Sequence, residues 1–194
     1  MSNLEIIAVL LGLANIILIV RRSLWNYPFG LAMVTLYFFI FYDSRLYSDA
    51  LLQIFFFVAQ VYGWWNWLRG REGDGELIVR RATPLQFAVV LVALAIATAA
   101  WGWLMHRFTD AAFPWWDAAV AMTSVAAQIL MAKRYFENWL LWVAVDALAV
   151  GLYATRGLTL TAGLYTVFLL IAIWGWVEWI RVARAQKAAV LLPA

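Results

Sequence analysis

The chain has 194 residues, of which 66% are hydrophobic and only 13% are charged, whereas a soluble domain carries about 25% charged residues. It contains no cysteine, which excludes disulfides, thiolate metal sites and thiol catalysis. We therefore predict an integral membrane protein and interpret the net charge of +3 as a signal of membrane topology, not as a nucleic-acid-binding surface.

Apolar stretches follow one another along the chain, and each can cross a hydrocarbon core of about 30 Å as a helix. Seven such segments are predicted, at residues 4–20, 25–42, 46–68, 85–105, 115–132, 137–154 and 158–180. Strands are not expected, because an open sheet edge has no hydrogen-bond partners in lipid. The first segment lacks the positive flank and cleavage site of a signal peptide, so we expect it to be a retained membrane helix.

The connection at residues 70–84 is charged and glycine-rich, which predicts a solvated linker. Basic residues are unevenly distributed: eleven of the fourteen fall on the side of the membrane that includes the loop after the first segment. Short cytoplasmic loops carry the excess of Lys and Arg, so that side is predicted to be cytoplasmic. The N-terminus is then outside, and the tail at residues 182–194 is in the cytoplasm.

An internal repeat relates the two ends of the chain. GWWNWLR at residues 63–69 aligns with GWVEWIR at residues 175–181 when the sequence is shifted by 112 positions. The same shift places Arg22 on Arg134 and Asn26 on Asn138. Residues 4–69 and 115–181 are therefore predicted to be two three-helix repeats, separated by a lone membrane helix at residues 85–106.

The lone helix determines the relative direction of the repeats. Three crossings end on the opposite side of the membrane and a fourth brings the chain back, so the two repeats are predicted to be parallel. Parallel repeats occur in transporters whose substrate site lies near the middle of the membrane, where the halves meet. A transporter of all-α, three-plus-one-plus-three plan is the resulting prediction.

Polar residues inside the predicted spans are the candidates for function. Asn138, Trp142 and Asp146 are spaced by four residues and share one face of a helix. A carboxylate in the middle of a span costs about 2.5–3.5 kcal/mol on insertion scales, so Asp146 is expected to line a cavity and to face a cation or sugar hydroxyls. The alternative is a hydrogen bond from Asp146 to a neighbouring helix that serves packing.

Further candidates lie in the third and fifth spans. Gln128 is a cavity candidate in the fifth span, where the Ser124 hydroxyl is expected to bond back to its own helix. In the third span, Gln53, Gln60 and Trp64 lie in one stripe, and amides beside an indole suit a planar or cationic ligand.

The seventh span has an equivalent stripe, which includes Tyr165 and Trp176. An aromatic belt at the membrane interface is the alternative for the clustered tryptophans, and we prefer it for Trp65, Trp67 and Trp179. Helix packing is the preferred interpretation of the glycine that precedes each cluster.

Enzymatic functions find no support in the sequence. The only histidine, His106, is predicted to lie in a loop outside the membrane, so no histidine-based metal site or triad can be built. GxxxxGK[ST] is absent from the chain, which excludes ATP hydrolysis at a P-loop. We predict no catalytic residue, no metal and no cofactor.

Two long segments resemble the PnuC family of bacterial nicotinamide riboside transporters. WNYPFGLAMVTLYFFIFYDSRLYSDALLQIFFFVAQVYGWWNW, at residues 25–67, is similar to the first half of that family, and residues 113–179, which contain ENWLLW, are similar to the second half. The resemblance implies the seven-helix plan of SWEET sugar transporters, uptake by facilitated diffusion across the inner membrane, trapping by a cytoplasmic kinase, and a homotrimer.

The resemblance also implies a set of substrate-binding positions on the third, fifth, sixth and seventh spans. These positions are Gln53, Gln60, Trp64, Gln128, Asn138, Trp142, Asp146, Tyr165 and Trp176. Some members of the family carry Asn where this chain has Asp146, and a carboxylate suits the pyridinium of nicotinamide riboside or the thiazolium of thiamine. Thiamine or another vitamin is therefore the alternative cargo. A sugar carrier and a membrane scaffold that transports nothing are more distant alternatives.

Overall fold

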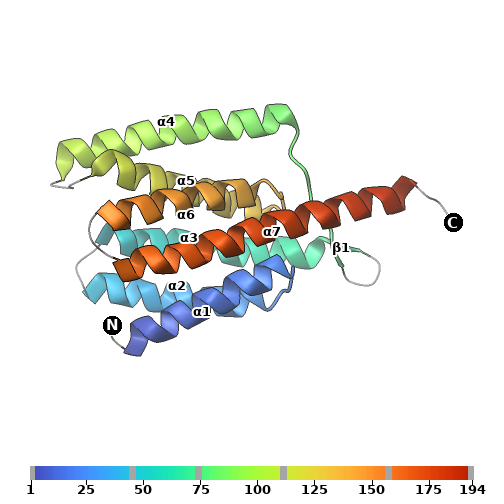
Figure 1. Cartoon of the computed structure of the whole chain (residues 1–194), viewed down its shortest axis with the longest axis horizontal. Coiled ribbons are helices and arrows are strands. Elements are labelled where there is room, and N and C mark those ends of the chain that lie inside the picture. The colour runs from blue at the N-terminus through green and yellow to red at the C-terminus, as the bar shows by residue number, and fades with distance from the viewer. Residues whose placement is uncertain (1–2, 44–46, 73–75, 110–112, 156–158, 192–194) are drawn as a thin grey trace. The chain divides into compact units, whose positions relative to one another are not determined.

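The computed structural model describes residues 3–43, 47–72, 76–109, 113–155 and 159–191. Seven α-helices and two short strands lie within these ranges (Figure 1). In chain order they are α1 (Asn3–Val20), α2 (Asn26–Asp43), α3 (Tyr47–Arg69), β1 (Arg71–Glu72), β2 (Glu76–Leu77), α4 (Pro84–Phe108), α5 (Pro114–Ala132), α6 (Asn138–Thr155) and α7 (Thr159–Leu191). The predicted seven-helix plan is confirmed.

The helices fall into two compact units. The first unit contains residues 1–78 together with residues 132–134, and the second contains residues 79–131 and 135–194. Within the first unit, α2 packs against both α1 and α3, and within the second, α6 packs against α7. α4 belongs to the second unit, where Phe87, Val90 and Leu94 pack on a cluster formed by α5 and α6.

Three sequence-based predictions differ from the structure. The linker predicted at residues 70–84 contains an antiparallel pair of two-residue strands, which pairs Arg71 with Leu77. His106 lies in the last turn of α4 and not in a loop, because that helix continues to Phe108. α7 runs to Leu191, well beyond the predicted end of the span at residue 180, because RVARAQKAAVL consists mainly of strong helix formers and contains no Gly or Pro.

The described helices differ in whether they are long and apolar enough to cross a membrane. Pro84–Phe108 and Ala162–Ala189 are long and apolar enough to cross a bilayer, while Leu4–Val20 and Asn138–Leu152 are apolar but shorter. Exposed apolar side chains cover α4, where Leu85, Val89 and Ile96 are each more than half exposed. Such a surface is expected of a helix that contacts lipid rather than water.

The end of α1 is closed by an arginine in the left-handed conformation. Arg22 has φ 54°, and the backbone N–H of Ser23 donates to the Leu18 carbonyl at 2.9 Å, which is the bond of a Schellman cap. A side chain at positive φ is uncommon outside glycine and asparagine. The cap satisfies carbonyls that the end of the helix leaves without partners.

The same cap recurs at the end of α5. Arg134 has φ 67°, and the N–H of Tyr135 donates to the Leu130 carbonyl at 3.0 Å. These residues are displaced from the first set by 112 positions, the offset at which the sequence repeats. The repeat is thus also present in the backbone hydrogen bonds of each unit.

The third helix of each repeat carries a glycine that lies under an aromatic ring. A Cβ atom added to Gly63 on α3 would lie 2.9 Å from the Tyr27 hydroxyl oxygen, and one added to Gly175 on α7 would lie 2.6 Å from ring atoms of Trp139. Tyr27 and Trp139 are also separated by 112 positions. The packing role predicted for both glycines is confirmed.

Gly175→Ala should lower the free energy of unfolding by about 1–3 kcal/mol, because the Trp139 ring must move to admit the methyl group. Gly163→Ala is the matched control on the same helix, since nothing lies within 4 Å of a Cβ at that position. The control should be neutral or stabilising by up to about 1 kcal/mol. Thermal unfolding of both variants in detergent measures the difference, and equal melting temperatures would contradict the contact.

Candidate functional site

Helix α6 carries two buried polar side chains on one face. Asp146 is 5% exposed and Asn138 is fully buried. Trp142, one turn from each, has a buried Nε1 that has no hydrogen-bond partner. The four-residue spacing places the three side chains on one face of the helix, as predicted from the sequence.

Asn138 has a structural role at the start of this helix. Its Nδ2 donates to the Tyr135 carbonyl at 2.6 Å, and its backbone N–H donates to the same carbonyl at 3.2 Å. Asn26 makes the equivalent bonds to Ser23 at the start of α2. Only the buried Oδ1 of Asn138, which lacks a partner, is left to accept a hydrogen bond from a ligand.

Helix α5 contributes further buried polar side chains, which include Ser124 and Gln128. The Ser124 hydroxyl donates to the Val120 carbonyl at 2.9 Å, so the predicted bond to its own helix is confirmed. Gln128, four residues further along, is 9% exposed. It lies on the same face as Ser124 and remains a candidate.

Helix α7 carries the last two candidates of the second unit. Tyr165 is half-buried and its ring makes an edge-to-face contact with Phe168, at 5.8 Å between ring centroids. Trp176 lines a groove together with Arg81 and Glu137, and its buried Nε1 has no hydrogen-bond partner. Trp176 thus adjoins a region that the sequence did not mark as a site.

The candidates on α3 belong to the first unit. Gln60 is 5% exposed, and its amide lies over Gly30 of α2, where a methyl group would overlap it. Trp64 stacks on Tyr27 with ring centroids 6.0 Å apart and ring planes 4° from parallel. Gln53 is half-buried. The nine predicted positions are therefore divided, with three in the first unit and six in the second.

The predicted aromatic belt is wrong for two of the three tryptophans assigned to it. Trp67 and Trp179 are fully buried, and their rings make edge-to-face contacts with Tyr27 at 5.4 Å and Trp139 at 5.8 Å. Trp65 is 49% exposed, as a belt residue should be, and the Arg69 guanidinium lies 4.1 Å from its ring.

Tyr27 and Trp139 were not recognised from the sequence as the partners of these rings. Because Tyr27 aligns with Trp139 at the offset of 112, comparison of aromatic positions between the repeats could have found them.

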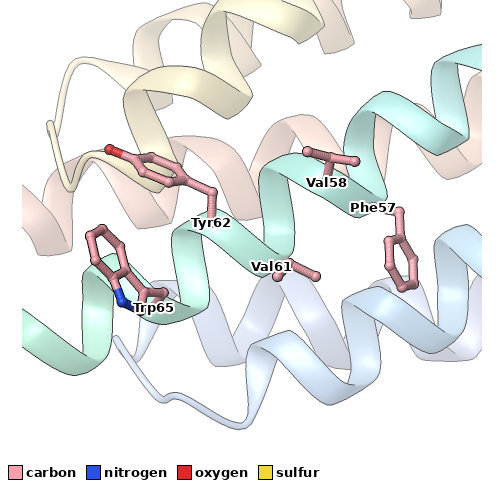
Figure 2. A pocket seen from close by; sticks show the side chains of 5 residues that line it. All are labelled: Phe57, Val58, Val61, Tyr62 and Trp65. Atoms are coloured by element: carbon pink, nitrogen blue, oxygen red, sulfur yellow. The ribbon is translucent and has the colours of Figure 1, made fainter.

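One concave surface on α3 contains none of the predicted positions. It has a volume of about 490 Å³ and is lined by Phe57, Val58, Val61, Tyr62 and Trp65 (Figure 2). All five side chains come from α3, and each of them is more than 40% exposed. An exposed face with so little polarity is suited to lipid and not to a vitamin, which needs hydrogen-bonding groups.

Clusters of side chains that could hold a metal ion do not occur in the part of the chain that the structure describes. No three His, Asp or Glu side chains there come close enough together to hold an ion. The candidates of both units are amides, indoles, a phenol and a carboxylate. Their chemistry is that of reversible binding by stacking, hydrogen bonding and charge.

Comparison with known proteins identifies the family. The family model for nicotinamide mononucleotide transporters matches residues 2–181. A nicotinamide riboside transporter, PnuC of Escherichia coli strain K12, is 32% identical over 98% of this chain and 90% of its own length. The chain belongs to the PnuC family.

Other relatives show how far the family extends. A riboflavin/roseoflavin transporter, RibM of Streptomyces davaonensis, is 28% identical over 96% of this chain and 89% of its own length. The crystal structure of the vitamin B3 transporter PnuC matches the fold with a TM-score of 0.78, covering 94% of this chain and 82% of that chain, at 24% identity. This PnuC-family chain is thus an integral inner-membrane protein of the transporter class.

Trp142→Phe should weaken vitamin binding. The substitution removes an N–H that already lacks a partner, and it also shortens a side chain that packs on the cluster of Ala127, Leu130 and Leu141, so the empty protein should remain folded with a lower free energy of unfolding. Loss of one hydrogen bond to a ligand should raise Kd by roughly 2- to 12-fold. Calorimetric titration with nicotinamide riboside tests this, with Trp174→Phe on the exposed face of α7 as the control. An unchanged Kd would remove Trp142 from the site.

Proposed function

We propose that this chain carries nicotinamide riboside into the cell by facilitated diffusion. The family is one of transporters, and the relative at 32% identity that bears this cargo in its name matches nearly the whole chain. Since the match leaves no long region of either protein unaligned, it supports transfer of the activity and not merely of one domain.

The observation that carries this proposal is the buried carboxylate of Asp146. It is 5% exposed, and no basic side chain among the described residues forms an ion pair with it. An ionised carboxylate in an apolar environment is unfavourable unless it is paired. The pyridinium of nicotinamide riboside is a permanent cation and would supply the missing charge.

Neighbouring groups fit the rest of the same molecule. The Oδ1 of Asn138 can accept a hydrogen bond from a ribose hydroxyl, and the indole N–H of Trp142 can donate one. Each buried polar atom without a partner costs about 1–3 kcal/mol, so these atoms favour a bound ligand that satisfies them. Aromatic side chains on α7 would add a stacking surface for the pyridinium ring.

The second part of the proposal concerns the plan of the repeats and the vitamin-binding positions that each repeat carries. The recurrence of caps, glycine contacts and edge-to-face pairs at an offset of 112 supports a SWEET-like plan of parallel repeats, residues 4–69 and 115–181, around helix 85–106. The proposed vitamin-binding positions are, in the first repeat, Gln53, Gln60 and Trp64 and, in the second repeat, Gln128, Asn138, Trp142, Asp146, Tyr165 and Trp176. The bias of Lys and Arg supports an outside N-terminus and a cytoplasmic C-terminus.

The energy for accumulating the vitamin in the cell would come from a reaction that this protein does not catalyse. The chain has no P-loop, so we propose passive transport followed by phosphorylation of the vitamin by a cytoplasmic kinase. A homotrimer is the proposed assembly. The proposed vitamin-binding positions all belong to this chain, so transport by the purified protein should not need the kinase.

Thiamine is the second candidate, because its thiazolium would satisfy Asp146 equally well. The relative named for riboflavin shows that cargo varies within the family. Riboflavin is neutral, however, and would leave the carboxylate unpaired. The charge of Asp146 therefore favours either cationic vitamin over riboflavin.

Purified protein in liposomes should take up labelled nicotinamide riboside to equilibrium without an ion gradient or ATP. Labelled thiamine and a hexose are tested in parallel, and empty liposomes measure leakage. Saturable uptake of thiamine alone would replace the proposed cargo. If none of the three compounds enters, the chain is not a passive carrier of this class and the scaffold alternative gains support.

Asp146→Asn should raise the Kd for nicotinamide riboside by roughly 10- to 150-fold, as expected for loss of one charge-assisted interaction. The amide is nearly the same size as the carboxyl group, so packing is preserved. Asp43→Asn, at the exposed end of α2, is the control for loss of one negative charge. Equal affinities in a folded Asp146→Asn variant would show that the carboxylate faces the protein and not the vitamin.

A further inference from the structure

A second concave region lies entirely within the second unit, apart from the polar face of α6. This groove has a volume of about 670 Å³ and is bounded by the start of α4, the residue before α6, and α7. Its walls are mainly apolar and include Phe87, Leu140 and Ile180. Two oppositely charged side chains, Arg81 and Glu137, complete the lining.

Glu137 is the unusual residue of the groove. It is 6% exposed, and its Oε1 accepts a hydrogen bond from the backbone N–H of Ala82 at 3.0 Å. Its buried Oε2 has no hydrogen-bond partner. Burial raises the pKa of the carboxyl group, while the Ala82 N–H and the charge of Arg81 act in the opposite direction.

Arg81 is exposed at the same groove and forms no ion pair with Glu137 among the described contacts. Its guanidinium lies 6.0 Å from the Phe136 ring. The groove therefore contains a cation that is open to solvent and a buried anion, of whose two oxygens only one has a hydrogen-bond partner. A ligand with one negative and one positive group complements this pair.

The position of the groove suggests the source of such a ligand. The apolar helix α4 begins at Pro84, directly after the charged linker, so this end of the helix marks a boundary between the hydrocarbon core and water. Leu85 and Val89 on α4, and Ile173 and Val177 on α7, are exposed apolar side chains on the helices that form the groove. Acyl chains can lie along these helices while a headgroup occupies the charged end.

We propose that the groove binds a phospholipid whose headgroup carries a primary ammonium, with its phosphate at Arg81 and its ammonium at Glu137. The acyl chains lie over Phe87, Leu140 and Ile180. This inference depends on the membrane location of the chain and is independent of which vitamin it transports.

Hydrogen-bond chemistry distinguishes this ligand from the other common headgroups. A primary ammonium has N–H donors for the Glu137 Oε2, whereas the quaternary ammonium of a choline headgroup has none. A glycerol headgroup has no positive charge to offset the buried carboxylate. Nicotinamide riboside has a cation but no anionic group for Arg81.

Native mass spectrometry of the full-length protein tests the proposal. The protein is released from micelles that contain equal amounts of phosphatidylethanolamine, phosphatidylcholine and phosphatidylglycerol with identical acyl chains. Adducts with phosphatidylethanolamine should exceed each of the others by roughly tenfold, as expected for one charge-assisted hydrogen bond. Equal adducts of the three lipids would overturn the proposal, and this measurement needs no variant.

Substitutions then locate the site. Glu137→Gln retains an oxygen that can accept from Ala82 and removes only the charge, so the preference for phosphatidylethanolamine should fall to near unity. Arg81→Ala should reduce the adducts of all three lipids, because each has a phosphate. Glu178→Gln is the matched control, since Glu178 pairs with Arg181 at 3.2 Å on α7 and is not part of the groove.

Two further outcomes count against the proposal. A full preference for phosphatidylethanolamine in a folded Glu137→Gln variant would place the ammonium elsewhere. Displacement of the bound lipid by added nicotinamide riboside would show that the groove belongs to the transport pathway. Unchanged lipid adducts at saturating vitamin support a separate lipid site.

Discussion

Each three-helix repeat depends on an aromatic ring packed onto a helix glycine. In lipid, apolar side chains gain little by leaving their surroundings, so helices associate mainly through close packing and a few polar contacts. Tyr27 packs onto Gly63 and makes an edge-to-face contact with Trp67, while Trp139 does the same with Gly175 and Trp179. These contacts join α2 to α3 and α6 to α7.

The same contact determines which face of α6 is available for a ligand. Successive residues of an α-helix are separated by about 100°, so Asn138 and Trp139 point in different directions. With the Trp139 ring directed at α7, the stripe of Asn138, Trp142 and Asp146 is rotated away from that contact. The packing residues recur in both repeats, whereas Asp146 aligns with Val34, which is 1% exposed. A shared scaffold thus supports different polar groups in its two halves, which suits a ligand that has no symmetry.

The length of the apolar segments predicted the helices well and predicted their ends less well. Apolar length identified all seven helices, because every backbone polar group must find a partner inside lipid and only a helix provides those partners within one segment. Helix ends depend on caps and on the residues beyond the apolar stretch. α7 therefore continues to Leu191 through a polar sequence of high helix propensity, which hydropathy does not detect.

Tryptophans illustrate the same limitation at the level of side chains. Trp65 and Trp67 are two positions apart in one cluster, yet the first is 49% exposed and the second is fully buried. Tryptophan is enriched at membrane interfaces on average. Whether a particular tryptophan is exposed or buried depends on the direction in which its side chain points from the helix axis. The partner that buries Trp67 is Tyr27, forty residues earlier in the chain.

The amino-acid sequence by itself determined the membrane class, the helical plan and the internal repeat, since these follow from apolar length and from an alignment of the chain with itself. Tertiary structure alone decided which polar atoms keep a partner. Asn138 uses its Nδ2 at the start of α6 and leaves Oδ1 without a bond, and Glu137 binds Ala82 through one oxygen only. The hydrogen bond from Ala82 to Glu137 joins residues that are close in space and 55 positions apart in the sequence, so no pattern along the chain records it.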